Sequence, residues 1–298
     1  MRIAVVGNCQ SRGLIDCLEA LAPGHLFEAI QLEHVQDSED PALQAVMALA
    51  SEVDAMFVHL PKYALSGSGE QEVLRNLLAQ VRSVIAIPSV IFGGFHPDIN
   101  VLRCNGRYLE TVASYYHSAI VAGAYLCGLP ASRVPALFNR FIYAGLGYAD
   151  DFVHHGRSLL ESFAQLGFDG RYIFAAKRTF MHCPNHPAVS ILFELAKQML
   201  ERVNIKPLPG ARMPEDWLGK YSFLLPSYPG LPGSAPGEFD PADPAASLQI
   251  VHGERVIRWD EFIDSSYVCY AAHRLETTDW HAPAIERAAR FLREHVRP

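Results

Sequence analysis

The chain has 298 residues and a hydrophobic fraction of 50%, which is sufficient for a large core in one elaborate domain or in a domain with a substantial appendage. Its formal net charge of −7, without a basic run, argues against a protein that binds duplex nucleic acid. No apolar run approaches the ~20 residues that span a bilayer, no signal peptide precedes the first strand, and the six cysteines lack CxxC spacing, so we expect reduced thiols in a cytoplasmic protein.

The first hundred residues alternate short apolar runs with amphipathic stretches. The pattern predicts strands over 2–6, 27–35, 54–60 and 83–87, and helices over 11–22, 40–50 and 69–81. Short strands separated by ~10–15-residue helices indicate right-handed βαβ units, and therefore an α/β fold with a parallel sheet. Ligands of such sheets bind outside the carboxyl ends of the strands, which draws attention to residues 7–11, 59–62 and 88–98.

The rest of the chain is less regular. The middle region, 108–165, is predicted to be mostly helical, with helices over 116–127 and 134–143, and another helix is expected over 187–203. Residues 207–247 are rich in proline and glycine and indicate a long irregular loop. The chain then closes with an apolar stretch at 259–263 and a last helix over 283–295.

Cys9 follows the first strand directly, in the sequence Gly7-Asn8-Cys9-Gln10-Ser11. The positive end of the following helix favours an anion or a thiolate at this place, so Cys9 is a candidate nucleophile. The alternative is that Cys9 is a small buried residue of the core. The stretch lacks the GxGxxG and GxxxxGK[ST] spacings of nucleotide loops. The backbone N–H groups of Cys9 and Gln10, with the Asn8 amide, could instead hold an oxyanion in acyl transfer.

A cysteine nucleophile needs a base, and four of the thirteen histidines have suggestive settings. These are His186 before a predicted helix, His96 on the loop after the fourth strand, His117 at a helix start, and His281 two residues from an acid. Taken singly, each is more typical of a packing or capping residue. His182, Cys183 and His186 do not match a metal signature, and no metal is expected.

Several basic side chains lie near the predicted strand ends and could bind a phosphate or a carboxylate. They are Arg12, Lys62, Arg103 and Arg107. The alternative for each is a solvated surface charge.

Four motifs in order resemble the WcbI family of polysaccharide-biosynthesis enzymes from bacterial capsule clusters. They are Gly7-Asn-Cys-Gln-Ser11, Gly94-Phe-His-Pro-Asp98, Tyr116-His-Ser-Ala-Ile120 leading to Ala124-Tyr-Leu-Cys-Gly-Leu129, and Asn185-His-Pro187. The resemblance covers about residues 1–205, which we take as a catalytic domain, with 206–298 as a Pro/Gly-rich loop and C-terminal extension packed on it. It implies a three-layer α/β core similar to the SGNH (GDSL-type) hydrolases.

The resemblance implies that the protein is an O-acetyltransferase. Its substrates would be acetyl-coenzyme A as donor and a glycan or sugar-nucleotide as acceptor. Whether the protein forms a homo-oligomer stays open. By likeness to the hydrolases, Cys9 stands at the nucleophile position and His186 at that of the base. Cys183 occupies the place of the hydrolases' aspartate, so the orienting carboxylate is missing, or is supplied by Asp98 or another residue. We also assign Asn8, His96 and Asp98 to the reacting centre. The residues that we assign to coenzyme A binding are Gln10, Ser11, Arg12, Lys62, Tyr116 and His117.

Two other functions stay open on the sequence. The first is an SGNH-like esterase that deacetylates a glycan, in which water replaces the acceptor. The second is a non-catalytic module that binds a glycan or a nucleotide-sugar. His96 and His281 remain rivals to His186 as the base. For Cys9 two roles stay open, because it either attacks the acyl group or only orients the thioester.

Overall fold

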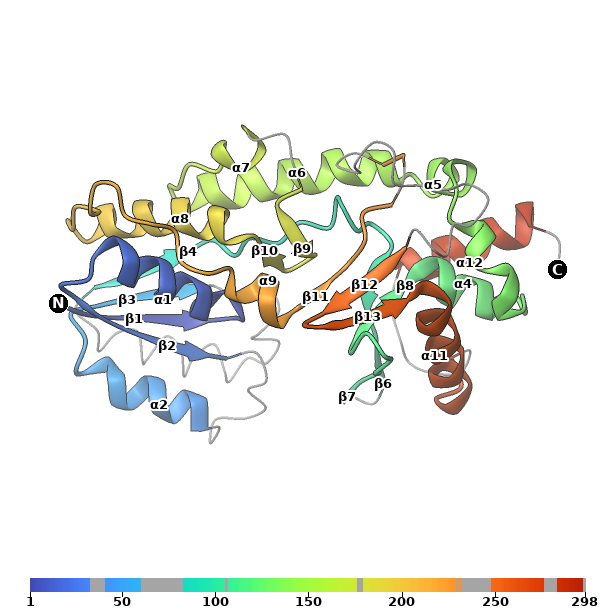
Figure 1. Cartoon of the computed structure of the whole chain (residues 1–298), viewed down its shortest axis with the longest axis horizontal. Coiled ribbons are helices and arrows are strands. Elements are labelled where there is room, and N and C mark those ends of the chain that lie inside the picture. The colour runs from blue at the N-terminus through green and yellow to red at the C-terminus, as the bar shows by residue number, and fades with distance from the viewer. Residues whose placement is uncertain are drawn as a thin grey trace. The chain divides into compact units, whose positions relative to one another are not determined.

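The computed structural model describes residues 1–32, 41–59, 83–104, 107–175, 179–228, 230–231, 248–275 and 283–296 (Figure 1). The chain forms two compact units that interleave along the sequence. Unit 1 comprises 1–91, 158–180 and 186–220, and unit 2 comprises 92–157, 181–185 and 221–298. The domain boundary at 205 that the sequence suggests stays a prediction.

Unit 1 contains a four-stranded parallel sheet with the strand order β2-β1-β3-β4. Its elements in chain order are β1 (Arg2–Gly7), α1 (Gln10–Leu21), β2 (Leu26–Gln31), α2 (Pro41–Ala50), β3 (Ala55–His59), β4 (Val84–Ile87), α7 (Tyr172–Ala175), β10 (His186–Pro187), α8 (Val189–Arg202) and α9 (Trp217–Tyr221). The predicted α/β fold with a parallel sheet is confirmed. The predicted strand over 27–35 ends at Gln31 in the structure, and the helix expected over 69–81 lies outside the described residues.

The sheet of unit 1 is covered on both faces (Figure 1). Alternate residues of β1, such as Ala4 and Val6, pack with Val46 and Leu49 of α2 on one face, because successive side chains of a strand point to opposite sides. On the other side, α1 packs against α8. Their approach is close, since a Cβ added at Gly13 would lie 2.8 Å from Leu192.

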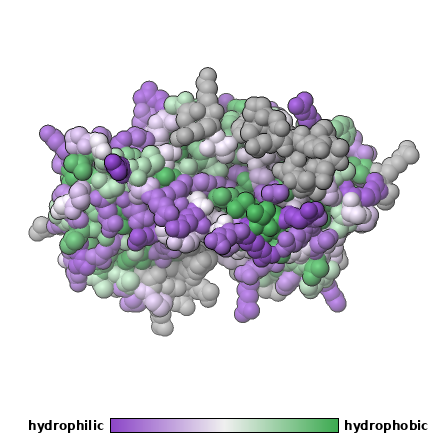
Figure 2. Space-filling model, in the orientation of Figure 1, coloured by the Kyte–Doolittle hydropathy of each residue, from purple (hydrophilic) through white to green (hydrophobic). Residues whose placement is uncertain are grey.

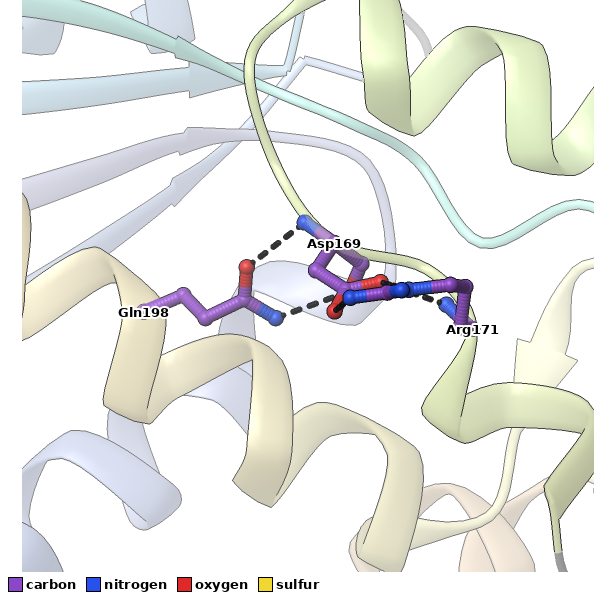
Figure 3. A network of polar contacts seen from close by, with 3 residues as sticks. All are labelled: Asp169, Arg171 and Gln198. Atoms are coloured by element: carbon purple, nitrogen blue, oxygen red, sulfur yellow. Dashed lines mark hydrogen bonds and ion pairs between the residues drawn. The ribbon is translucent and has the colours of Figure 1, made fainter.

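An exposed polar network fixes the turn before α7 to helix α8 (Figure 3). The amide of Gln198 accepts from the backbone N–H of Asp169 at 2.8 Å and donates to its carbonyl at 2.9 Å. The Asp169 carboxylate in turn accepts hydrogen bonds from the Arg171 guanidinium, which lowers the pKa of Asp169 to about 2. One side-chain amide therefore satisfies both backbone groups of Asp169 in this turn.

Unit 2 combines short strands with helices around a separate core. Its elements are β5 (Ile99–Val101), β6 (Arg103–Cys104), β7 (Arg107–Tyr108), β8 (Tyr116–Ser118), α4 (Ala119–Leu126), the 3₁₀ turns Ala131–Arg133 and Pro135–Leu137, α5 (Arg140–Gly145), β9 (Met181–Cys183), β11 (Phe223–Leu224), β12 (Gln249–His252), β13 (Arg255–Arg258), α11 (Trp259–Ala272) and α12 (Pro283–His295). Helix α6 (Tyr148–Gln165) begins in unit 2 and ends in unit 1. The last predicted helix, 283–295, is confirmed.

The helices predicted over 116–127 and 134–143 are shorter in the structure, because polar residues cap new helix starts inside them. Ser118 ends strand β8, and its Oγ accepts from the N–H of Val121 to begin α4. Asn139 accepts from the N–H groups of Phe141 and Ile142 to begin α5. Such caps satisfy amides that have no partner within the helix, so a helix begins again at each of them.

Within the described residues, no helix is both long enough and apolar enough to cross a membrane. On the visible face, hydrophilic residues are spread between smaller apolar areas (Figure 2).

Candidate functional site

The turn between β1 and α1 presents Cys9 at the start of a helix of 12 residues. Asn8 caps this helix, because its Oδ1 accepts from the N–H of Gln10 and its carbonyl accepts from the N–H of Ser11, both at 3.0 Å. The Cys9 side chain makes no capping hydrogen bond and is half-buried. The positive electrostatic potential at the start of the helix therefore acts on the Cys9 sulfur, and this setting favours a thiolate.

Two side chains of this turn bind it to the segment that follows β4. The Asn8 amide donates to Ser89 Oγ at 3.0 Å. The Gln10 amide donates to the Val90 carbonyl at 2.9 Å and accepts from the Val90 N–H at 3.0 Å. Gln10 is completely buried. The oxygen and the nitrogen of its side-chain amide both bind the backbone of Val90. Gln10 is therefore a positioning residue for the Cys9 turn.

Ser11 and Arg12 belong to the first turn of α1. Ser11 is fully buried, and its Oγ has no hydrogen-bond partner among the residues described. Arg12 is half-exposed and pairs with Asp16 one turn later, at 2.9 Å. The guanidinium adds positive charge to the same helix end, which suits an anionic ligand group.

His186 also lies in unit 1, where it is 8% exposed and directly precedes α8. Asp216 caps α8, since its Oδ2 accepts from the N–H of Val189 at 3.1 Å. Its Oδ1 accepts from the N–H of Gly219 at 2.9 Å. A carboxylate is therefore present at the helix start beside the His-Pro turn, although Cys183 occupies the sequence position where the hydrolases carry one. Asp216 lies far from His186 along the chain, so the sequence alone does not identify it as a neighbour of this helix start.

Two further candidate histidines, His96 and His117, lie in unit 2, and both are buried. His96 contacts the Leu225 carbonyl through Nε2 at 3.1 Å. His117 contacts the Leu109 carbonyl through Nε2 at 3.0 Å and the Tyr270 hydroxyl through Nδ1 at 3.2 Å. Burial lowers the pKa of each to about 4. Both imidazoles are therefore neutral at pH 7 and hydrogen-bonded within their own unit.

Asp98 is the centre of a buried polar cluster in unit 2. Its carboxylate accepts from the hydroxyls of Tyr148 at 2.7 Å and Tyr228 at 2.9 Å, from the N–H of Ile120 at 2.9 Å, and from Ser118 Oγ. Asp98 is completely buried, and this burial raises its pKa. With four donors from its own unit, the carboxylate has the surroundings of a structural anchor.

Tyr116 is likewise held inside unit 2. Its hydroxyl donates to Asn185 Oδ1 at 2.8 Å and lies 3.0 Å from Cys183 Sγ. The structure thus brings Asn8, Cys9, Gln10, Ser11, Arg12 and His186 into unit 1, and His96, Asp98, Tyr116 and His117 into unit 2. Lys62 and His281 lie outside the described residues.

A family model described as "Polysaccharide biosynthesis enzyme WcbI" matches residues 2–208. The chain belongs to the WcbI family. The resemblance that the four motifs indicate over about 1–205 is thereby confirmed, and with it the general assignment to enzymes of polysaccharide biosynthesis.

A solved structure of WcbI shares the fold of this chain. It is described as a novel polysaccharide biosynthesis enzyme, in its native form without a disulfide bond between coenzyme A and a cysteine. The two proteins are 14% identical, the match covers 98% of this chain and 94% of that one, and the TM-score is 0.68. No curated protein matches the chain.

Metal ligands do not gather in this WcbI-family chain as far as the structure describes it: no group of three or more His, Cys, Asp or Glu side chains there could hold an ion.

Replacing Gln10 with methionine is expected to lower the free energy of unfolding by about 2–4 kcal/mol, because the buried N–H and carbonyl of Val90 both lose their partner. Urea unfolding measures this change. The matched control is Glu19→Met on the exposed side of the same helix, which should change the stability by less than about 0.5 kcal/mol. Equal stability of the two variants would contradict the role of Gln10 in holding the Cys9 turn to Val90.

Proposed function

We propose that this chain transfers an acetyl group from acetyl-coenzyme A to a sugar hydroxyl of a glycan or sugar-nucleotide, with Cys9 as the nucleophile and His186 as the base. The observation that carries the proposal is the half-buried Cys9 at the positive end of α1, in a turn that Asn8 caps and Gln10 holds in place. Membership of a polysaccharide-biosynthesis family supports a glycan acceptor. The related structure, whose description names coenzyme A together with a cysteine, supports the thioester.

The proposed reaction has two steps at one carbonyl carbon. The Cys9 thiolate attacks the thioester, an S–C bond forms, and coenzyme A leaves as a thiolate that takes up a proton. A sugar hydroxyl then gives its proton to His186 and attacks the acetyl group. The new ester forms as the Cys9–carbon bond breaks. Backbone N–H groups at the start of α1 stabilise the negative charge on the carbonyl oxygen in both steps.

The first turn of α1 also fits the ligand. Arg12 and the helix end supply positive charge for phosphate groups of coenzyme A. The six cysteines, all of which the structure describes, form no disulfide, as in a reducing compartment, and we place the reaction in the cytoplasm on this ground.

Replacing Cys9 with alanine is expected to lower acyl transfer at least about 10³-fold, because the nucleophile is lost. Mass spectrometry of the intact wild-type protein mixed with acetyl-coenzyme A alone should show one added acetyl group, and Cys9→Ala should show none. Cys104→Ala is the matched control, since Cys104 is half-buried like Cys9 but lies in unit 2.

Calorimetric titration with coenzyme A completes the test. Absence of binding would overturn the proposal. Hydrolysis of an aryl acetate that needs Cys9 but not coenzyme A would instead establish an esterase. Unchanged glycan acetylation in cells carrying both Cys9→Ala and His186→Ala would leave a binding module.

A further inference from the structure

The carboxyl ends of β1 and β3 meet where the strand order of the sheet reverses. The two strands pair in parallel as far as Val6 and Val58, so the next residues, Gly7 and His59, are neighbours. A crevice outside the strand ends at such a reversal is where parallel α/β sheets bind their ligands. His59 therefore lies beside the first residue of the Cys9 turn.

The side chain of His59 packs closely against the backbone of Gly7. A Cβ added at Gly7 would lie only 2.5 Å from both the Cβ and the Nδ1 of His59. Only glycine leaves room for an imidazole against this stretch of backbone. A larger residue at position 7, immediately before Asn8 and Cys9, would therefore collide with the His59 ring.

The His59 ring is buried, with 2% exposure, and neither ring nitrogen has a hydrogen-bond partner among the described residues. A neutral imidazole always carries one N–H donor and one acceptor nitrogen. By contrast, both nitrogens of His117 and one of His96 have partners. A buried polar group without a partner is rare and points to a role in binding or catalysis.

The charge state of His59 restricts that role. Burial lowers its pKa to about 3, so the ring is neutral at physiological pH. A group that binds protons so weakly is a poor general base near pH 7. As a neutral hydrogen-bond donor, however, it needs no change of protonation to act.

We propose that His59 is a catalytic residue of the Cys9 site, where its neutral imidazole donates a hydrogen bond to the carbonyl oxygen of the bound acyl group. The inference rests on the proposed acyl transfer at Cys9. As the thiolate attacks, the C=O electron pair moves onto oxygen and the N–H···O bond strengthens. No proton leaves the ring. The pair returns to the carbon as coenzyme A departs.

The test compares His59→Leu with His59→Gln. Leucine removes the donor, whereas glutamine carries an amide N–H at the reach of Nε2. His59→Leu should slow acylation of Cys9 by acetyl-coenzyme A about 100-fold or more, with unchanged affinity for coenzyme A and no loss of melting temperature. His59→Gln should regain at least tenfold of the rate.

His117→Leu is the control for a buried histidine whose nitrogens have partners, and it should lower the melting temperature. Equal rates for wild type and His59→Leu would overturn the proposal. So would a rate loss in both His59 variants that follows a fall in melting temperature, since that is the behaviour of a packing residue.

A second measurement does not depend on turnover. In Cys9→Ala protein with ¹⁵N-labelled histidine, the His59 ring signals are identified by their loss on adding His59→Gln. They should show a neutral ring and should shift with acetyl-coenzyme A more than with coenzyme A, which has no carbonyl at its sulfur. Calorimetric binding of acetyl-coenzyme A that leaves these signals unmoved would overturn the role of His59 alone. Absence of binding by the wild-type chain would overturn the proposed function as well.

Discussion

Lowering the pH from 6.5 to 4.5 is expected to remove on the order of 6–7 kcal/mol from the free energy of unfolding through three buried histidines. Three histidines are buried as neutral rings, and burial lowers the pKa of His59 to about 3 and those of His96 and His117 to about 4. In the unfolded chain each titrates near its ordinary pKa of about 6.5. Because folded domains are stable by only about 5–15 kcal/mol, a loss of this size is sufficient to unfold the protein.

The direction of the effect follows from proton binding. Between pH 6.5 and the folded pKa, the unfolded chain binds more protons than the folded one, so each histidine costs about 1.4 kcal/mol for every pH unit of acidification. Their full contribution to stability is present above pH 6.5. Asp98 acts in the opposite direction, because burial raises its pKa in the folded protein and its protonation on acidification favours the folded state.

Urea unfolding at a series of pH values between 7.5 and 4.5 measures this dependence. His117→Gln should reduce the slope of stability against pH by about one proton, since one buried histidine is gone. The control is His273→Gln, which removes an exposed histidine and should leave the slope unchanged. A stability that stays constant down to pH 5 would show that these rings ionise freely in the folded state.

The parallel sheet and the Cys9 turn could be predicted from the sequence because their signals are local. Residues 3–6 form a short apolar run, a glycine ends it, and apolar residues at helical spacing follow from Leu14 onward. The start of α1 and the place of Cys9 depend on little else. The family motif at 7–11 is found for the same reason.

The partners of the buried polar groups could not be predicted, because they lie far away along the chain. His117 meets Tyr270 across 153 positions, and Asp98 meets Tyr228 across 130. The position of His59 beside Gly7 depends on the order of the strands, which no local pattern contains. A predicted strand end therefore identified residues 59–62 as worth inspection without indicating that His59 is the residue in contact with the Cys9 turn.

The short β12–β13 hairpin is also not predicted from the sequence, because its periodic signal is weak. Gln249–His252 and Arg255–Arg258 are brief, and only Ile250 and Ile257 bury their side chains completely. These two residues lie directly opposite each other in the hairpin. A single buried pair is too weak a periodic signal to predict two strands.

Removing the Asp98 carboxylate is expected to cost at least about 4 kcal/mol of stability, the second large effect. In Asp98→Ala, the hydroxyls of Tyr148, Tyr228 and Ser118 and the N–H of Ile120 all lose their acceptor in a buried place, at about 1–3 kcal/mol each. Asp98→Asn should cost less, about 1–2 kcal/mol, because its oxygen still accepts two of these bonds and the remaining hydroxyls can rotate to accept from its amide.

The pair of Asp98 variants also separates anchoring from catalysis. The control for stability is Asp264→Ala, which removes an exposed carboxylate from α11 in the same unit and should be nearly neutral. If Asp98 is an anchor, the acylation rate of Asp98→Asn follows the folded fraction and returns to that of wild type at low temperature. A variant that stays folded yet loses acylation more than about 100-fold would instead place Asp98 at the reacting centre. We expect the first result, because a carboxylate that already accepts four hydrogen bonds has little capacity left to orient a histidine or to take up a proton.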